Sequence, residues 1–374
     1  MSKIHYDFLI ELFSHYTFDI NQFVGYKIIS KGHINTTYVL YFDNGNKVKR
    51  YLLQEINTNV FKDPSMLMDN IFNVTTFLEN KLKENEVNYK NKVLRIVLSK
   101  NKNTYVKLKD NTYFRIYHYI ENSSSYDVSD KKEIFYQAGL CIGSFINHLS
   151  NFDVSKISYV INDFHNSQKR YQFFINTLNK ANKNKIKQCQ SEINYFIKNC
   201  YITDLIQPLI DQKQIPLRVT HNDTKLNNFL FEHKSNNYLC LIDLDTVMPG
   251  CICFDFGDFI RSACSSCLED EKDLNKVKFQ KDLALQFAEG FINKTKDTIT
   301  QTELNNLING AIVMSYECGM RFLTDFLLNN TYFKVEYENQ NLIRAKTQIH
   351  LCKQILENKK ELEEKILSIY NAHK

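Results

Sequence analysis

The chain has 374 residues, which exceeds the size at which one hydrophobic core usually stops growing and favours two domains. A formal net charge of +5, with charged residues at 24%, is too small and too dispersed to indicate a nucleic-acid-binding protein. No uncharged run reaches the roughly 18 residues that a transmembrane helix needs, so we expect a soluble, cytoplasmic protein with no membrane partner.

The first 120 residues carry most of the strand patterns. Residues 26–43 predict a strand, a turn and a second strand, and the NGN at 44–46 is a hairpin signal before a third strand at 48–57. Apolar residues at helical spacing predict one long helix over 64–84. Further strand patterns, which would complete a sheet of about five strands, lie at 92–99, 104–109 and 112–120.

The rest of the chain is mostly helical in pattern. The serine-rich stretch 121–127 is the best candidate for a linker. Helical patterns fill 130–215, including one across 191–210, and return over 275–370. We therefore expect an α+β protein with an N-terminal lobe at 1–121 and a helical C-terminal lobe at 122–374.

Two acids and an amide are predicted to converge at the mouth of a small hairpin. Residues 229–231 and 238–243 read as its two strands. Asp223 and Asn228 precede the first strand and Asp243 ends the second, so all three would meet at one end. Oxygen ligands of this kind suit magnesium in phosphoryl transfer.

The segment "HNDTKLNN" matches the catalytic loop of protein kinases at all four fixed positions, which are His221, Asp223, Lys225 and Asn228. The alternative is a structural one, because Asp and Asn commonly cap turns and end strands.

Asp255, Phe256 and Gly257 spell the kinase DFG, but they lie in "CFDFGDFIRSA", which reads as the start of a helix. We therefore assign the metal to Asp243. Asp255 and Asp258 are interpreted as buried or capping acids that brace the catalytic loop, and Arg261 could pair with either.

The motifs "THNDTKLNNFLF", "CLIDLDTVMPG", "FDFGDFIRSA" and "YECGMRFLTDFLLNNTYFKV" together resemble those of the N-acetylhexosamine 1-kinases. That family is a branch of the aminoglycoside phosphotransferase and choline kinase-like superfamily, and the resemblance runs from about Phe23 to the C-terminal helix. It implies a bilobal, protein kinase-like fold that uses ATP and Mg²⁺. It also implies phosphorylation of the anomeric hydroxyl of N-acetylglucosamine or N-acetylgalactosamine.

Chemistry and the resemblance together suggest roles around the loop. Asp223 would orient the sugar hydroxyl as base, and Lys225 would neutralise charge on the transferred phosphoryl group. Asn228 and Asp243 would hold Mg²⁺ at the ATP phosphates. Asp245 is left open between a second metal ligand and a sugar contact.

Arg321 and Tyr332 are the candidates for binding the sugar, since both side chains hydrogen-bond hydroxyl or acetamido oxygens. Their structural alternatives are an ion pair between Arg321 and Asp325 and a core position for Tyr332. Glu317 and Cys318 are interpreted as packing residues on the same helix.

The N-terminal lobe would bind the nucleotide. "SKGHINTTY" has one glycine where protein kinases have three, so side chains would assist its backbone at the phosphates. In the third strand Gln54 replaces the usual lysine, which argues against a lysine–glutamate clamp. The hinge Tyr119 to Glu121 would bind adenine through backbone groups. The expected phosphate-loop residues are Gly32, Asn35, Thr36 and Thr37.

Two other functions remain open from the sequence. One is a kinase for choline, ethanolamine or an aminoglycoside, although a cationic acceptor would not suit Arg321. The other is a kinase-like binding protein without catalysis, which Gln54 and the glycine-poor loop would support.

Overall fold

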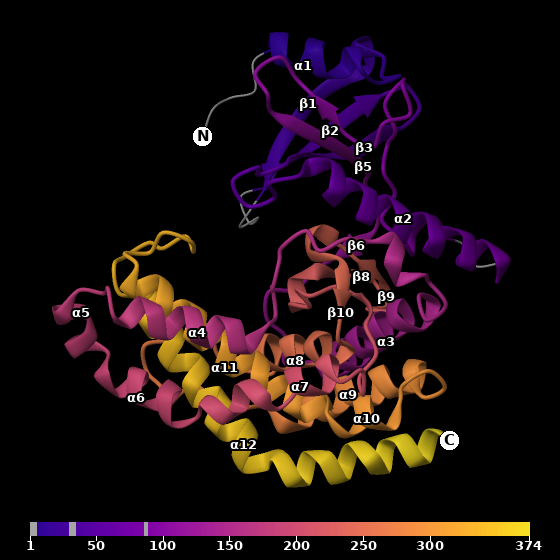
Figure 1. The fold of residues 1–374 in the computed structure, drawn as a ribbon. Coiled ribbons are helices and arrows are strands. Elements are labelled where there is room, and N and C mark those ends of the chain that lie inside the picture. The colour runs from indigo at the N-terminus through magenta and orange to yellow at the C-terminus, as the bar shows by residue number, and fades with distance from the viewer. Residues whose placement is uncertain (1–5, 30–34, 86–88) are drawn as a thin grey trace. The chain divides into compact units, whose positions relative to one another are not determined.

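The computed structural model describes residues 6–29, 35–85 and 89–374, and the chain divides into two compact units. Unit 1 comprises Met1–Ser123 and Ser155–Ile161, and unit 2 comprises Ser124–Val154 and Asn162–Lys374. Four strands of unit 1 (β1, β2, β3 and β5) and the helices that dominate unit 2 are labelled in Figure 1. The α+β class predicted from the sequence is confirmed. Across the described residues, none of the helices is both long enough and apolar enough to cross a membrane.

Unit 1 is built on a five-stranded antiparallel sheet in the order β1-β2-β3-β5-β4 (Figure 1). One face of the sheet carries the aromatic core together with α1 (Tyr6–Ser14), and the central strands β2 and β5 are buried over four consecutive residues each. The strand bounds are Phe23–Ile29 (β1), Thr36–Asp43 (β2), Val48–Glu55 (β3), Val106–Lys107 (β4) and Tyr113–His118 (β5).

The turn between β2 and β3 is the hairpin that the sequence predicts. Asp43 faces Val48 across it, and Asp43 Oδ1 accepts the Gly45 amide at 2.9 Å. Gly45 has φ 83°, a conformation that a residue with a Cβ rarely adopts, so the glycine of NGN fits its place.

Helix α2 (Pro64–Glu84) coincides with the predicted long helix. Asp63 caps it by accepting the Ser65 and Met66 amides at 3.0 Å, and proline suits the first turn, where an amide would have no helical partner. Its buried face is almost wholly apolar and comprises Pro64, Leu67, Met68, Asn70, Ile71, Val74, Thr75, Leu78 and Leu82.

Two predicted elements are wrong. Residues 92–99 do not form a continuous strand. Beyond the part of the β5 edge that β4 occupies, they make only an isolated bridge between Ile96 and Tyr117. Residues 191–210 form separate short helices. Pro208, which has no amide to donate, lies in the first turn of a new helix there.

Unit 2 contains most of the helices, two short strand assemblies in the orders β6-β8-β9 and β10-β7, and the hairpin predicted from the sequence (Figure 1). Its strands are Ser123–Ser124 (β6, at the boundary of the units), Arg218–Thr220 (β7), Phe229–Glu232 (β8), Tyr238–Leu241 (β9) and Met248–Gly250 (β10). Its helices are Lys132–His148 (α3), Ser167–Leu178 (α4), Lys183–Gln188 (α5), Gln190–Lys198 (α6), Gln207–Asp211 (α7), Ile252–Ala263 (α8), Lys281–Thr295 (α9), Gln301–Asn305 (α10), Leu307–Leu327 (α11) and Gln340–His373 (α12).

Helices α8 and α11 pack with their backbones in close approach. A Cβ placed on Gly257 of α8 would lie 2.3 Å from the carbonyl carbon of Gly310, and one placed on Gly310 would lie 2.0 Å from the oxygen of Cys253. Gly257 is the glycine of the DFG tripeptide. It therefore serves helix packing, which agrees with the prediction that this tripeptide lies in a helix.

We expect Gly257→Ala to lower the free energy of unfolding by roughly 2 kcal/mol or more, because the added methyl group meets backbone that cannot rotate away. Denaturant titration of the purified protein would measure the change. The control is Ser191→Ala at an exposed position of α6, which should be close to neutral. Equal stability of Gly257→Ala and wild type would contradict the close approach.

Candidate active site

A buried carboxylate on α8 holds the segment that carries the kinase-like motif. Asp255 accepts the backbone amides of His221 at 2.8 Å and Asn222 at 2.6 Å, one on each oxygen. Its carbonyl oxygen accepts the Thr224 hydroxyl at 2.6 Å. These three bonds confirm that Asp255 braces the loop, as the sequence predicts.

Asn222 makes the sharp turn that exposes the next residue. Its φ of 64° is left-handed, a conformation that asparagine tolerates better than most residues. The Asn222 amide group donates to Thr246 O at 2.9 Å and accepts the Thr220 hydroxyl at 3.0 Å. The turn is thus bonded to β7 and to the segment after β9.

His221 fixes the loop to the end of the hairpin. Its Nε2 lies 2.9 Å from Ile242 O, and its Nδ1 accepts the Asp223 amide at 3.2 Å. A carbonyl oxygen can only accept, so Nε2 carries a proton and donates to Ile242 O. His221 is buried and joins the loop to the end of the hairpin.

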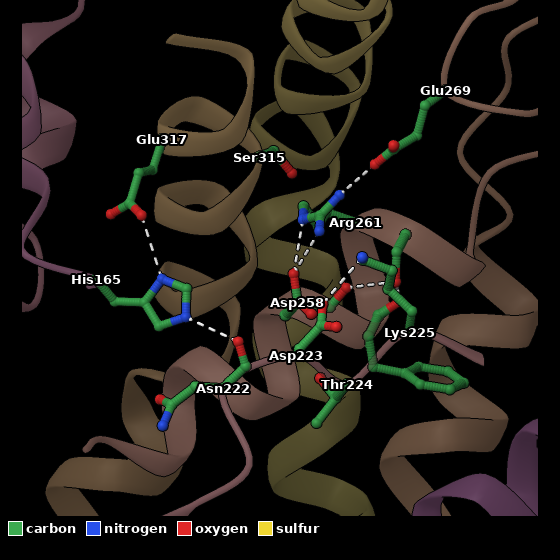
Figure 2. Close-up of polar contacts among 12 residues, drawn as sticks. His165, Asn222, Asp223, Thr224, Lys225, Asp258, Arg261, Glu269, Ser315 and Glu317 are labelled. Atoms are coloured by element: carbon green, nitrogen blue, oxygen red, sulfur yellow. Dashed lines mark hydrogen bonds and ion pairs between the residues drawn. The ribbon is translucent and has the colours of Figure 1, made fainter. Parts of the chain in front are cut away.

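Asp223 lies at the exposed end of this arrangement, with both of its oxygens occupied (Figure 2). Lys225 Nζ is 3.1 Å from Oδ1, and Asn228 Nδ2 donates to Oδ2 at 3.1 Å and to the carbonyl oxygen at 2.8 Å. The side chains of Asp223 and Lys225 remain 25% and 35% exposed, so a ligand can reach them.

The charges of this pair stabilise each other. Burial on its own would raise the pKa of Asp223, but Lys225 and then His221 outweigh it, and the pKa is lowered. Asp223 in turn raises the pKa of Lys225. The carboxylate is therefore ionised near neutral pH and is placed to orient a hydroxyl by accepting its hydrogen bond.

The hairpin brings Asp243 beside Asn228. Phe229 pairs with Leu241, and the Ile242 amide donates to Asn228 O at 2.9 Å, so Asp243 follows directly after the contact. Asp243 is left-handed, with φ 61°, and begins the short helical turn Leu244–Thr246.

The donors present suit a hard cation. Because the Asn228 Nδ2 is used by Asp223, its Oδ1 is the atom left to bind a metal, and Asp243 adds a carboxylate. Among the residues that the structure describes, no three His, Cys, Asp or Glu side chains could hold an ion together. Mg²⁺ held by Asn228 and Asp243 would complete its coordination with phosphate and water, and would supply charge neutralisation at the phosphates.

The other acids near the loop are already paired (Figure 2). Arg261 Nε donates to Asp258 Oδ1 at 2.8 Å, and its Nη1 lies 2.6 Å from Glu269. Of the two acids predicted to pair with Arg261, Asp258 is the one that does. The second ion pair, with Glu269, was not predicted from the sequence.

The candidate nucleotide-binding residues of unit 1 belong either to the phosphate loop and the neighbouring strands or to the hinge. Gly32 lies outside the described residues. Asn35 Oδ1 accepts the Asn57 amide at 3.0 Å, while Thr36 is exposed on β2. Thr37, on β2, accepts a hydrogen bond from Gln54, on β3, at 3.1 Å.

The hinge residues are held by one arginine. Arg50 forms an ion pair with Glu121, and its guanidinium lies 4.1 Å from the centre of the Tyr119 ring. The backbone is also engaged, because the Tyr119 amide donates to Arg50 O at 3.4 Å and Ile120 O accepts the Ser123 hydroxyl at 2.7 Å. Binding of adenine by this hinge stays a prediction.

The two candidate acceptor residues lie together in unit 2. The Arg321 guanidinium is 5.8 Å from the centre of the Tyr332 ring, 5.5 Å from that of Phe333 and 5.4 Å from that of Phe164. Tyr332 is 56% exposed, so the alternative that placed it in the core is wrong.

The structural alternative for Arg321, an ion pair with Asp325, is not formed either. Asp325 instead accepts the amides of Tyr332 at 2.8 Å and Phe333 at 3.0 Å, which fixes the segment after α11. Within the described part of the chain, Arg321 makes ring contacts and no ion pair.

His165 links this cluster to the loop and was not found from the sequence. Its Nε2 donates to Asn222 O at 3.1 Å and its Nδ1 lies 3.2 Å from Glu317 Oε1 (Figure 2). Burial on its own would raise the pKa of Glu317. The hydrogen bond to His165 acts in the opposite direction and contributes to a pKa that lies below its usual value. Phe164, next in the chain, contacts Arg321, and no spacing in "NDFHNS" signalled this role.

The fold and the loop are those of a phosphotransferase with a kinase-like fold. Residues 25–272, more than half of the chain, match the Phosphotransferase enzyme family. The chain belongs to that family.

Solved structures with low sequence identity share the fold. Spectinomycin phosphotransferase, solved with ADP and spectinomycin, matches with 14% identity over 96% of this chain and 100% of that one, with a TM-score of 0.59. Choline kinase from Cryptosporidium parvum matches with 16% identity over 98% of each chain, with a TM-score of 0.57. An aminoglycoside phosphotransferase from Alicyclobacillus acidocaldarius matches with 12% identity over 97% and 98%, with a TM-score of 0.61. The predicted kinase-like fold is confirmed.

We expect catalysis to fall as the pH drops through about 6. Burial raises the pKa of Asp255 to about 6, against the lowering effect of His221 and the two amides, and protonation would remove an acceptor from the loop. The raised pKa gives a stability contribution that is present below the ordinary value of 3.8 and is lost as the pH rises through about 6. Protonation of Asp255 should therefore lower kcat without lowering the Tm.

The comparison variant is Asp255→Asn, which keeps the shape of the side chain but can accept only one of the two amides. It should be less active at every pH and should show a flatter acid limb than the wild type in a profile of kcat against pH. An acid limb unchanged from the wild type would assign the effect to another group.

Proposed function

We propose that this protein transfers the γ-phosphoryl group of ATP, with Mg²⁺, to the anomeric hydroxyl of an N-acetylhexosamine such as N-acetylglucosamine or N-acetylgalactosamine. The product would be the sugar 1-phosphate. The observation that carries the acceptor class is Arg321, a cation held by aromatic rings and connected to the catalytic loop through Phe164 and His165.

Asp223 would accept the hydrogen bond of the acceptor hydroxyl and orient its oxygen towards the phosphorus. Its lowered pKa fits this role, because a loose phosphoryl-transfer transition state asks little of a base before the new bond has formed. Lys225, bonded to the same carboxylate, would place its charge at the transferring group.

The charges around Arg321 favour a neutral acceptor. Arg170 donates to Phe164 O at 3.2 Å, and Arg321 lies 5.4 Å from the Phe164 ring, so two guanidinium groups contact the same residue. Burial and then Arg321 lower the pKa of Arg170. The carboxylates nearby are engaged internally, Glu317 by His165 and Asp258 by Arg261. Sugar hydroxyls and an acetamido oxygen can accept hydrogen bonds from Arg321, and the aromatic rings beside it suit the apolar face of a sugar.

A quaternary ammonium or polyamine acceptor is the alternative. Choline, ethanolamine and aminoglycosides carry positive charge and would meet the two arginines. Family membership permits such acceptors, so the two acceptor classes have to be separated by experiment.

The direct test is release of ADP from Mg-ATP with N-acetylglucosamine, N-acetylgalactosamine, glucose, galactose, choline or an aminoglycoside, with phosphorus NMR of the product. We expect a glycosyl 1-phosphate from an N-acetylhexosamine. Turnover with choline or the aminoglycoside alone would contradict the sugar assignment while leaving the catalytic loop in place.

Asp223→Asn should lower kcat by about 10²–10⁴-fold while ATP still binds, since the amide accepts the hydroxyl hydrogen bond poorly. Asp297→Asn, an exposed acid of unit 2, is the matched control and should leave kcat unchanged. Retained turnover in Asp223→Asn would remove Asp223 from the reaction.

Arg321→Ala should raise the KM for the N-acetylhexosamine by roughly 10- to 100-fold, because a charge-assisted hydrogen bond would be lost. The KM for ATP should stay within about twofold of the wild type. Initial rates at varied sugar and varied ATP measure both constants. Lys198→Ala, which removes an exposed cation from α6, is the control, and an unchanged sugar KM in Arg321→Ala would exclude the contact.

A further inference from the structure

Three polar side chains form a row across the sheet of unit 1. Thr37 of β2 lies opposite Gln54 of β3, and Gln54 lies opposite Arg115 of β5. The neighbours Tyr38, Leu53 and Ile116 face the aromatic core with α1, so the alternation of a strand directs the row to the other face.

Hydrogen bonds join the row in one direction. Arg115 Nε donates to Gln54 Oε1 at 3.0 Å, and Gln54 Nε2 donates to Thr37 Oγ1 at 3.1 Å. A guanidinium has no acceptor, so Arg115 determines which end of the Gln54 amide is oxygen. The protons that remain, one on Gln54 Nε2 and one on the Thr37 hydroxyl, can only be donated.

The burial of Arg115 fixes the orientation of the Gln54 amide. Arg115 is 1% exposed, and its Nη1 lies 3.7 Å from the sulfur of Met68 on α2. Gln54 is half-buried, so its second amide proton lies near enough to the surface to meet a ligand.

The buried face of α2 carries no acid that could pair with a lysine in the place of Gln54. Every residue of α2 is described, and its buried face carries Asn70 and Thr75 as its polar residues and no acid. Protein kinases pair the strand lysine with a helix glutamate. Here Met68 packs against the arginine of the neighbouring strand.

We propose that Arg115 is a positioning residue for nucleotide binding, and that it holds Gln54 and Thr37 as a row of hydrogen-bond donors for a phosphate of the nucleotide. This inference rests on the proposed binding of ATP. The guanidinium of Arg115 lies on β5, one strand away from the β3 position that the usual lysine occupies. In place of the lysine, the Gln54 amide and the Thr37 hydroxyl would donate hydrogen bonds to the phosphate.

The row makes a specific prediction about restoring the lysine. In Gln54→Lys the ammonium group would lie beside the guanidinium, since Gln54 Oε1 is 3.0 Å from Arg115 Nε. We expect Gln54→Lys to bind Mg-ATP roughly 10- to 100-fold more weakly than the wild type. The double variant Gln54→Lys with Arg115→Gln should recover most of that loss. Calorimetric titration of the full chain with Mg-ATP measures each Kd.

A second test retains Arg115, so its result does not require that a variant lacking Arg115 folds. Gln54→Glu keeps a partner for Arg115 but offers a carboxylate in place of the N–H donor, so the Kd for Mg-ATP should rise by roughly 10-fold or more. Adenosine, which has no phosphate, should bind as it does to the wild type. Loss of adenosine binding as well would mean that the substitution acts on the fold. Lys49→Gln, an exposed position of β3, is the control and should match the wild type.

The outcomes separate the inference from the function it rests on. A wild type that does not bind Mg-ATP would overturn the proposed function. A wild type that binds it, with Gln54→Glu equally tight or Gln54→Lys as tight with Arg115 as without it, would overturn the role of Arg115 alone.

Discussion

The arrangement of the candidate catalytic loop, residues 221–228, depends on one buried carboxylate. Asp255 reaches from α8 to two consecutive backbone amides at a left-handed turn, where neither a helix nor a sheet could satisfy them. Once these amides are satisfied, the chain can reverse at Asn222 and present Asp223 outward. His221 and Thr246 complete the turn by joining it to the segment after β9. An acid within a helix thus positions the acid that would meet the substrate.

The same principle applies to the polar groups of both units. Two polar side chains have their geometry set by a neighbour that can only donate or only accept. Ile242 O fixes a proton on Nε2 of His221, and Arg115 sets the amide of Gln54. Fixed donors and acceptors of this kind need no reorganisation when charge develops on a ligand. The catalytic loop and the sheet are therefore preorganised within their own units.

Much of the fold could be predicted from local signals. The hairpin glycine, the Asp-Pro start of α2 and the strand patterns around "HNDTKLNN" each act over a few residues, so the sequence shows them directly. The pattern at 92–99 misled because strand formation depends on whether a neighbouring edge is free. His165 and Arg115 were missed for a related reason. Their partners are 57 and 61 residues away in the chain, and no spacing announces such contacts.

The close contact of Gly257 with Gly310 packs the helix that anchors the loop directly against the helix that carries the proposed acceptor residue. Helix α8 bears the anchor of the catalytic loop, while α11 bears Glu317 and Arg321 near the proposed acceptor. Because the helix backbones touch, α11 cannot shift to admit a larger molecule without displacing the anchor. Exchange of side chains along α11 and in the segment after it would therefore change the acceptor site more readily than movement of this helix pair.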